Sequence, residues 1–155
     1  MSKRHIHRNP PLATEHAEQA ALIEWWDLAC TKYNLPPWSL FAIPNGAKLP
    51  WGRNQKGERF SPEANKLKAE GLRPGVPDLM LAVPRIERGT NMGDASICIA
   101  HGLYVEMKRR PNKPSEDQEK VILYLRQRGY HVVIAYSFEE AKRAIDGYLR
   151  WPSPN

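Results

Sequence analysis

The chain has 155 residues, of which 41% are hydrophobic and 26% charged, a balance that fits one globular domain with a single core. A formal net charge of +6 and a sequence pI of about 9.4 favour a polyanionic partner. No apolar run approaches the roughly 20 residues that a membrane-spanning helix needs, and two cysteines are too few for a disulfide framework or a cysteine-based zinc site.

Residues 1–13 are predicted to form a flexible basic arm, 14–150 a single domain, and 151–155 a frayed tail. The basic start lacks the apolar stretch of a secretory signal. Cys30 and Cys98 are expected to be small buried side chains, which is typical of proteins in a reducing, cytoplasmic compartment.

The N-terminal half is predicted to contain two helices and one short strand. The first helix follows Thr14, a suitable N-cap, and continues to about Tyr33, because apolar residues recur at helical spacing. A β-like run follows at 38–44, and the Gly-rich, basic stretch 45–60 is predicted to be a loop. A short helix is expected over 61–70, opened by a Ser-Pro-Glu sequence and closed by a glycine.

The C-terminal half alternates between apolar runs and helical patterns, beginning after a stiff two-proline turn at 73–77. Ser115 and Gln118 form a capping-box pattern, and Ser137 is a second predicted N-cap. Strands are predicted at 79–83, 102–108 and 130–136, helices from Ser115 to about Arg128 and over 138–149, and a loose excursion at 85–97.

The run 102–108 alternates between apolar and polar residues, as a half-buried strand does. One face is expected to carry Leu103, Val105 and Met107, and the other Tyr104, Glu106 and Lys108. The order of elements predicts an α/β fold with a small central sheet flanked by helices. A right-handed crossover through the intervening helix should make the strands at 102–108 and 130–136 parallel.

Three charged residues border these apolar runs and predict a metal site. Asp78 precedes one strand, and Glu106 and Lys108 lie two residues apart on one face of another. If the strands are neighbours, the two carboxylates repel each other unless a cation lies between them. Mg²⁺ suits such oxygen ligands, and the main-chain carbonyl of Met107 is a further candidate ligand. Lys108 is expected to orient or deprotonate a water molecule and to offset charge in the transition state.

These residues also carry a resemblance to a known family. From about residue 15 to residue 149, the chain resembles the PD-(D/E)xK nuclease superfamily and, more narrowly, the small stand-alone members of the VRR-NUC family. The matching positions are Pro77-Asp78, Glu106-Met107-Lys108, Glu15 and Gln19 in the first helix, the Pro44-Asn45-Gly46 turn, and Gln118.

The resemblance implies a restriction-endonuclease-like fold with a small mixed sheet, and hydrolysis of DNA phosphodiester bonds with Mg²⁺ or Mn²⁺. It also implies homodimers that act on structured DNA, such as four-way junctions, in phages or bacteria. By this resemblance, Asp78, Glu106 and Glu15 are the expected metal-binding acids, with Lys108 as the catalytic lysine. The long stretch 85–101 departs from the family pattern and leaves the substrate class and partner contacts open.

Several assignments have alternatives. Glu15 competes with Glu18 as the helical site acid, although Glu15 shares its helix face with Gln19. Gln118 fits equally well as part of the capping box or of the site, and Asn45 fits as a turn residue. For the whole protein, the alternatives to a nuclease are a DNA-binding module without catalysis, and an interaction protein whose acids are ordinary surface residues.

Basic residues outside the site are candidate phosphate contacts, although a solvated surface is the usual explanation for such runs. The tryptophans Trp25, Trp26 and Trp38 fit core packing better than base stacking. The candidate phosphate contacts are Lys3, Arg4, Arg8, Lys48, Arg53, Lys56, Arg59, Arg73, Arg109, Arg110 and Lys113.

Overall fold

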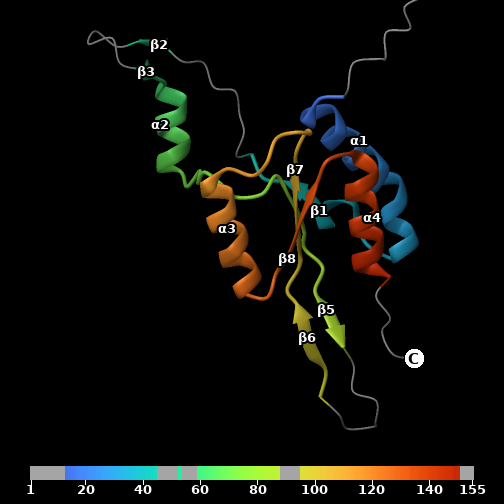
Figure 1. The fold of residues 1–155 in the computed structure, drawn as a ribbon. Coiled ribbons are helices and arrows are strands. Elements are labelled where there is room, and N and C mark those ends of the chain that lie inside the picture. Colours follow the sequence, from blue (N-terminus) through green and yellow to red (C-terminus); the bar gives the residue numbers. More distant parts are fainter. Residues whose placement is uncertain (1–12, 45–51, 54–58, 88–94, 151–155) are drawn as a thin grey trace, which may run out of the picture.

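The computed structural model describes residues 13–44, 52–53, 59–87 and 95–150, in which helices lie on both faces of a small central sheet (Figure 1). The helices are α1 (Glu15–Ala29), α2 (Pro62–Ala69), α3 (Glu116–Gln127) and α4 (Phe138–Leu149), with 3₁₀ turns at Cys30–Tyr33 and Pro37–Ser39. The strands are β1 (Leu40–Ala42), β2 (Gly52–Arg53), β3 (Arg59–Phe60), β4 (Leu79–Leu81), β5 (Arg85–Glu87), β6 (Ile97–Ala100), β7 (Leu103–Met107) and β8 (His131–Ala135).

The central sheet is mixed and has the strand order β1-β4-β7-β8. β4 pairs antiparallel with both β1 and β7, whereas β7 and β8 are parallel, as the intervening helix predicts. Leu79 lies opposite Val105, so the preceding residue, Asp78, reaches the level of Glu106 at the end of β7. The predicted α/β fold class and the neighbouring positions of the two acidic strand ends are confirmed.

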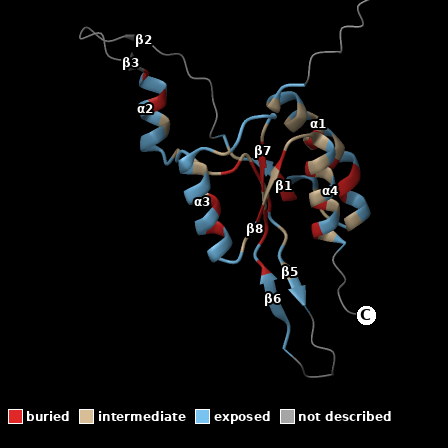
Figure 2. Cartoon of the chain, viewed as in Figure 1, coloured by how far each residue is buried: buried red, intermediate tan, exposed pale blue. Residues whose placement is uncertain are grey.

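The sheet has two apolar faces. On one face Leu103, Val105 and Met107 are buried in the main core, which α1 and α4 cover. On the other face Tyr104 packs against a smaller cluster that joins α3 to β8. Figure 2 shows buried residues on the central strands and on the helix faces turned toward them. The predicted alternation along β7 is confirmed, but Glu106 on its polar face is also buried.

The predicted helix starts are confirmed by side-chain caps. Thr14 accepts a hydrogen bond from the Ala17 N–H, and Ser61 accepts one from the Ala64 N–H. The Ser115 capping box is present, and Ser137 accepts a hydrogen bond from the N–H of the third residue of α4. These contacts fix where the helices begin, and therefore where their first-turn side chains lie relative to the sheet.

Two segments predicted to be irregular contain strands. In place of a loose excursion, β5 and β6 pair antiparallel and form an arm at the end of the sheet opposite the end of β7 that carries Glu106 (Figure 1). β2 and β3 also pair within the predicted loop 45–60. Both ladders are short and flanked by polar or Gly-rich sequence, which gave no clear period-two signal.

The arm also changes the expected environment of one cysteine. Cys30 is buried as predicted, but the prediction for Cys98 is wrong, because this residue lies on the exposed ribbon of β6. Among the tryptophans, Trp26 is fully buried and Trp25 half-buried, whereas Trp38 is 77% exposed and does not belong to the core.

Several predictions fall outside the described residues. These concern the basic arm up to residue 12, the tail at 151–155, Asn45, Lys48 and Lys56, and the side chains of Arg53 and Arg59. Across the described part of the chain, the helices are too short or too polar to traverse a bilayer.

Candidate active site

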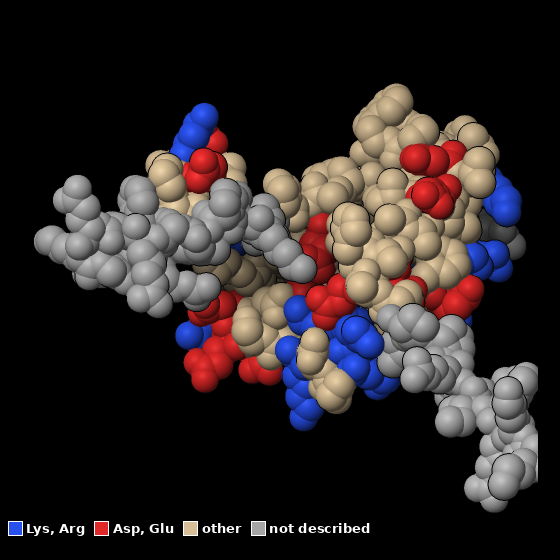
Figure 3. Space-filling model, turned by 90° about the horizontal axis from the view of Figure 1, so that it is seen from above, with Lys and Arg blue, Asp and Glu red and all other residues tan. Residues whose placement is uncertain are grey.

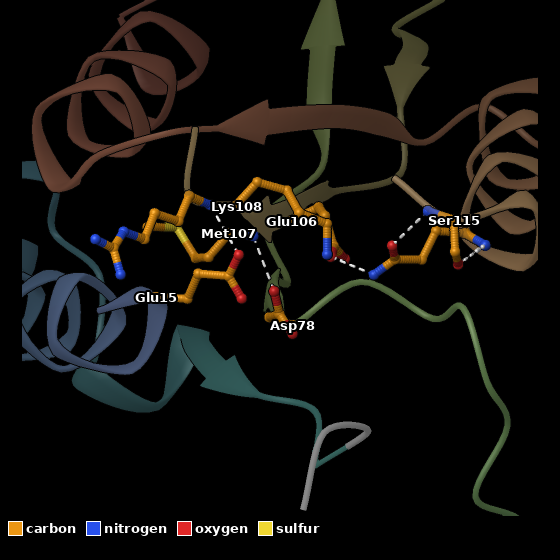
Figure 4. A network of polar contacts seen from close by, with 8 residues as sticks. Glu15, Asp78, Glu106, Met107, Lys108 and Ser115 are labelled. Carbon is orange, nitrogen blue, oxygen red and sulfur yellow. Dashed lines mark hydrogen bonds and ion pairs between the residues drawn. The ribbon is translucent and has the colours of Figure 1, made fainter. Parts of the chain in front are cut away.

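Glu106 and Lys108 form a contact at the end of β7 (Figure 4). The Lys108 Nζ lies 2.7 Å from the Glu106 Oε1, and the side chains are 13% and 1% exposed, respectively. Their separation of two residues on a strand places both on the same face. The pair therefore combines a carboxylate shielded from water with an ammonium group at the edge of the site.

Asp78 lies beside this pair, at the start of β4. Its Oδ2 accepts a hydrogen bond from the Met107 main-chain N–H at 2.8 Å, and its own main-chain carbonyl accepts one from Ile43. In a strand, the N–H and C=O of one residue point toward the same neighbour. The Met107 carbonyl therefore also lies on the Asp78 side of β7, where it was predicted as a candidate ligand.

The environment of both carboxylates opposes their ionisation. Burial is the largest cause of the raised pKa of Glu106, which reaches about 7 although Lys108 acts in the opposite direction. The charges of Asp78 and Glu15 raise the pKa of Glu106 further. Burial also raises the pKa of Asp78, and the Met107 hydrogen bond and Lys108 offset part of this effect. A cluster of acids with raised pKa values is typical of a functional site.

Gln118 belongs both to the capping box and to the site. Its Oε1 accepts a hydrogen bond from the Ser115 main-chain N–H at 2.9 Å, and its Nε2 donates to the Glu106 Oε1. The two alternatives left open by the sequence are therefore compatible. Because Ser115 fixes the amide oxygen, the amide nitrogen is turned toward Glu106. Ser115 thus orients Gln118 toward Glu106. The capping-box pattern in the sequence did not predict this second role of Ser115.

The two acids in the first turn of α1 have different contacts. The Glu15 Oε1 accepts a hydrogen bond from the Arg109 main-chain N–H at 2.8 Å, next to the Lys108 end of the site. The Glu18 Oε2 accepts one from the Phe138 N–H at 2.6 Å, at the start of α4. The geometry therefore brings Glu15 to the site and gives Glu18 a capping role, while Gln19 lies half-buried one turn further along α1.

The residues present fit a divalent cation held by two acids. The Glu106 Oε2 is buried and has no hydrogen-bond partner within the described residues, which is costly for a carboxylate unless a cation binds it. Asp78 and the Met107 carbonyl lie beside it, and Mg²⁺ commonly uses one or two carboxylates and keeps several waters. Over the described ranges, no group of three or more His, Cys, Asp or Glu residues is arranged to hold a metal. The part of Glu15 in metal binding stays a prediction.

Basic residues follow Lys108 on this end of the molecule. Figure 3, which views this end, shows Lys and Arg side chains gathered beside acidic ones. Arg109 and Lys113 are exposed. Arg110 is also exposed, but its guanidinium contacts Glu140 at 3.1 Å, and its Cζ lies 4.3 Å from the centre of the Tyr136 ring. Arg73 donates hydrogen bonds to main-chain carbonyls at the end of α2.

Comparison with known proteins identifies the family of the chain. Residues 13–139 match the family model described as the VRR-NUC domain. The chain belongs to the VRR-NUC family. This membership makes the protein a member of a nuclease family, for which DNA is the expected partner. No curated protein matches the sequence.

A solved structure described as a VRR_NUC domain protein shares the fold of this VRR-NUC chain. Its TM-score is 0.61 and its sequence identity 22%, and the match covers 89% of each chain. At this level of identity the likeness concerns the fold, so the roles of individual residues rest on the geometry described above.

Proposed function

We propose that this VRR-NUC protein is a Mg²⁺-dependent endonuclease that hydrolyses DNA phosphodiester bonds, and that Mn²⁺ can replace Mg²⁺. The observation that carries the proposal is the buried Glu106 carboxylate, whose Oε2 lacks a partner in the described structure while its Oε1 contacts Lys108. A carboxylate in this state favours a cation, and the adjacent Asp78 supplies a second acidic ligand.

Each residue has a separate role in the proposed reaction. Glu106, Asp78 and the Met107 carbonyl hold the cation, which when bound polarises the phosphate and lowers the pKa of a bound water. Lys108 orients the attacking water and offsets the negative charge that develops on the phosphate. Gln118 holds the Glu106 Oε1 in place. Glu15 acts from the edge of the site through water, because its Oε1 is already bonded to the Arg109 N–H.

The preferred substrate is proposed to be branched DNA, such as a four-way junction, cut by a homodimer. Family membership supports DNA as the partner, and the exposed Arg109 and Lys113 beside the site suit phosphate contacts. Two copies of the site would allow both strands to be cut. We propose that this activity takes place in the cytoplasm of a bacterial or phage-infected cell, which the resemblance to small phage and bacterial nucleases supports.

A cleavage assay tests the proposal directly. Labelled linear, single-stranded, flap and four-way-junction DNA would be incubated with the protein and Mg²⁺, Mn²⁺ or a chelator. The variants Asp78→Asn and Glu106→Gln remove charge with little change in shape, and Lys108→Ala removes the ammonium group. Glu119→Gln is a matched control, because Glu119 is an exposed carboxylate on α3.

Metal-dependent cleavage by the wild type and Glu119→Gln, reduced by about 100-fold or more in the three site variants, is the expected result. Sedimentation of the protein with a junction should show two protein chains per DNA. DNA binding without cleavage under every metal condition would contradict the proposal and support a non-catalytic binding module. Absence of both binding and cleavage would support an interaction protein with ordinary surface acids.

A further inference from the structure

Gly75 makes an unusually close main-chain contact with α3. The residue has a φ of +86°, and a Cβ added to it would lie 2.5 Å from the Asp117 O, 2.6 Å from the Asp117 C and 3.0 Å from the Gln118 N. These atoms are main-chain atoms in the first turn of α3, so they cannot rotate away as a flexible side chain would. The absence of a side chain at Gly75 therefore sets how closely the 73–77 turn approaches the helix.

This contact joins the two segments that hold opposite sides of the site. Asp78 lies three residues after Gly75 and accepts the Met107 N–H. Gln118, whose main chain touches Gly75, donates its side-chain amide to the Glu106 Oε1. Glu106 thus lies between the 73–77 turn, which leads to Asp78, and the first turn of α3, which carries Gln118. These two segments contact each other at Gly75.

We propose that Gly75 is a positioning residue, which sets the α3 N-terminus so that Gln118 directs the Glu106 carboxylate toward the site shared with Asp78. The inference rests on the proposed nuclease function for its kinetic effect, but its structural effect exists without metal or DNA. Adding a Cβ at Gly75 displaces the Asp117–Gln118 peptide, and the Gln118 amide moves with it. Glu106 then loses the Gln118 donor to its Oε1, and only the Lys108 ammonium group still contacts that atom in the described structure.

The chain offers a matched control for backbone strain. Gly71 also has a positive φ, +107°, but nothing lies within 4 Å of a Cβ added there. A substitution at either glycine imposes a left-handed conformation on a residue with a side chain, whereas only the one at Gly75 also meets α3. Asparagine tolerates this conformation better than alanine, so Gly75→Asn keeps the added Cβ with less strain if Gly75→Ala does not fold.

The first measurement is structural. The side-chain amide signals of Gln118, assigned by their loss in Gln118→Ala, would be followed by ¹H–¹⁵N NMR of the metal-free protein. We expect them to shift in Gly75→Ala and Gly75→Asn and to stay in place in Gly71→Ala and Gly71→Asn. Unchanged Gln118 signals in folded Gly75 variants would overturn the inference, whether or not the protein proves to be a nuclease.

The second measurement is a double-mutant cycle on cleavage and on Mn²⁺ affinity by calorimetry. We expect the Gly75 variants to lower kcat by about 10- to 100-fold with KM changed less than about threefold, since small misplacements at a site have effects of this size. The Gly75/Gln118→Ala double variants should lose no more than Gln118→Ala alone, both in kcat and in Mn²⁺ affinity. Additive losses would overturn the inference, because Gly75 would then act by a route that does not include Gln118.

Discussion

At the scale of single residues, the site depends on the burial of Glu106. A carboxylate that is 1% exposed loses most of its hydration, and the ion pair with Lys108 does not restore it in full. The pKa of about 7 expresses this balance. In the absence of metal the protein therefore carries an acid whose protonated and ionised forms are about equally populated near pH 7.

This burial predicts a pH-dependent stability. The folded protein binds the Glu106 proton more tightly than the unfolded chain, in which the pKa is near the ordinary value of 4.5. The contribution of Glu106 to stability is therefore complete below about pH 4.5 and is lost as the pH rises through about 7. A shift of this size corresponds to at most about 3 kcal/mol. Glu106→Gln should raise the free energy of unfolding of the metal-free protein at pH 8 by an amount approaching this limit.

Urea denaturation in the presence of a chelator at pH 4, 6 and 8 measures the effect. The difference between Glu106→Gln and the wild type should shrink toward zero at pH 4, and Glu119→Gln should show no such trend. A Glu106→Gln variant less stable than the wild type at pH 8 would mean that the ionised carboxylate is favourable in the folded protein.

The sequence predicted which residues meet but not how each is bonded. Strand periodicity placed Glu106 and Lys108 on one face, and the acidic start of the neighbouring run placed Asp78 near them. The unpartnered Glu106 Oε2 depends on the packing of α3 over that face, which no local pattern encodes. The close approach of Gly75 to α3 had no signal beyond a glycine between two prolines.

At the scale of elements, the ends of the helices link the site to the rest of the fold. α1 contributes two acids from a single turn, one toward the end of β7 and the other to the start of α4. Helix caps and the parallel pairing of β7 with β8 were predictable because they follow from short-range rules. The β5–β6 arm was not predictable, because three to four residues per strand give too little periodicity.

The different contacts of Glu15 and Glu18 predict opposite effects of two neighbouring substitutions. Glu18→Ala removes a charged acceptor at the N-terminus of α4 and should lower the free energy of unfolding by about 1–2 kcal/mol, with cleavage nearly unchanged. Glu15→Ala should cost less stability but should lower the cleavage rate by about tenfold or more. Both variants would be measured by thermal denaturation and by cleavage of the four-way junction. A larger loss of cleavage in Glu18→Ala than in Glu15→Ala would make Glu18 the site acid.

At the scale of the whole molecule, the positive charge is expected to set the affinity for DNA. The net charge of +6 accompanies an acidic site, so basic groups elsewhere are the expected phosphate contacts. Arg109, Arg110 and Lys113 are all exposed, but the Arg110 guanidinium already contacts Glu140 and Tyr136. This difference was invisible in the sequence, where Arg109 and Arg110 are adjacent.

The salt dependence of DNA binding tests whether Arg110 differs from Arg109 and Lys113 in its contribution to phosphate binding. With a chelator present, fluorescence anisotropy at several salt concentrations gives the slope of log K against log salt. Arg109→Ala and Lys113→Ala should each reduce the slope by about 1, because each removes a phosphate contact. Arg110→Ala should change it less and should mainly lower stability, by up to about 1 kcal/mol. Equal slope changes for all three would mean that Arg110 leaves Glu140 when DNA binds.

The most direct test of a cation held by Glu106 and Asp78 is anomalous diffraction from crystals grown with Mn²⁺. We predict a single strong anomalous peak within bonding distance of the Glu106 Oε2 and the Asp78 carboxylate, roughly 2.0–2.2 Å for a small divalent ion, and its loss in Glu106→Gln crystals. A map without a peak at this position, or with Mn²⁺ bound elsewhere while the Glu106 Oε2 stays unligated, would contradict the account.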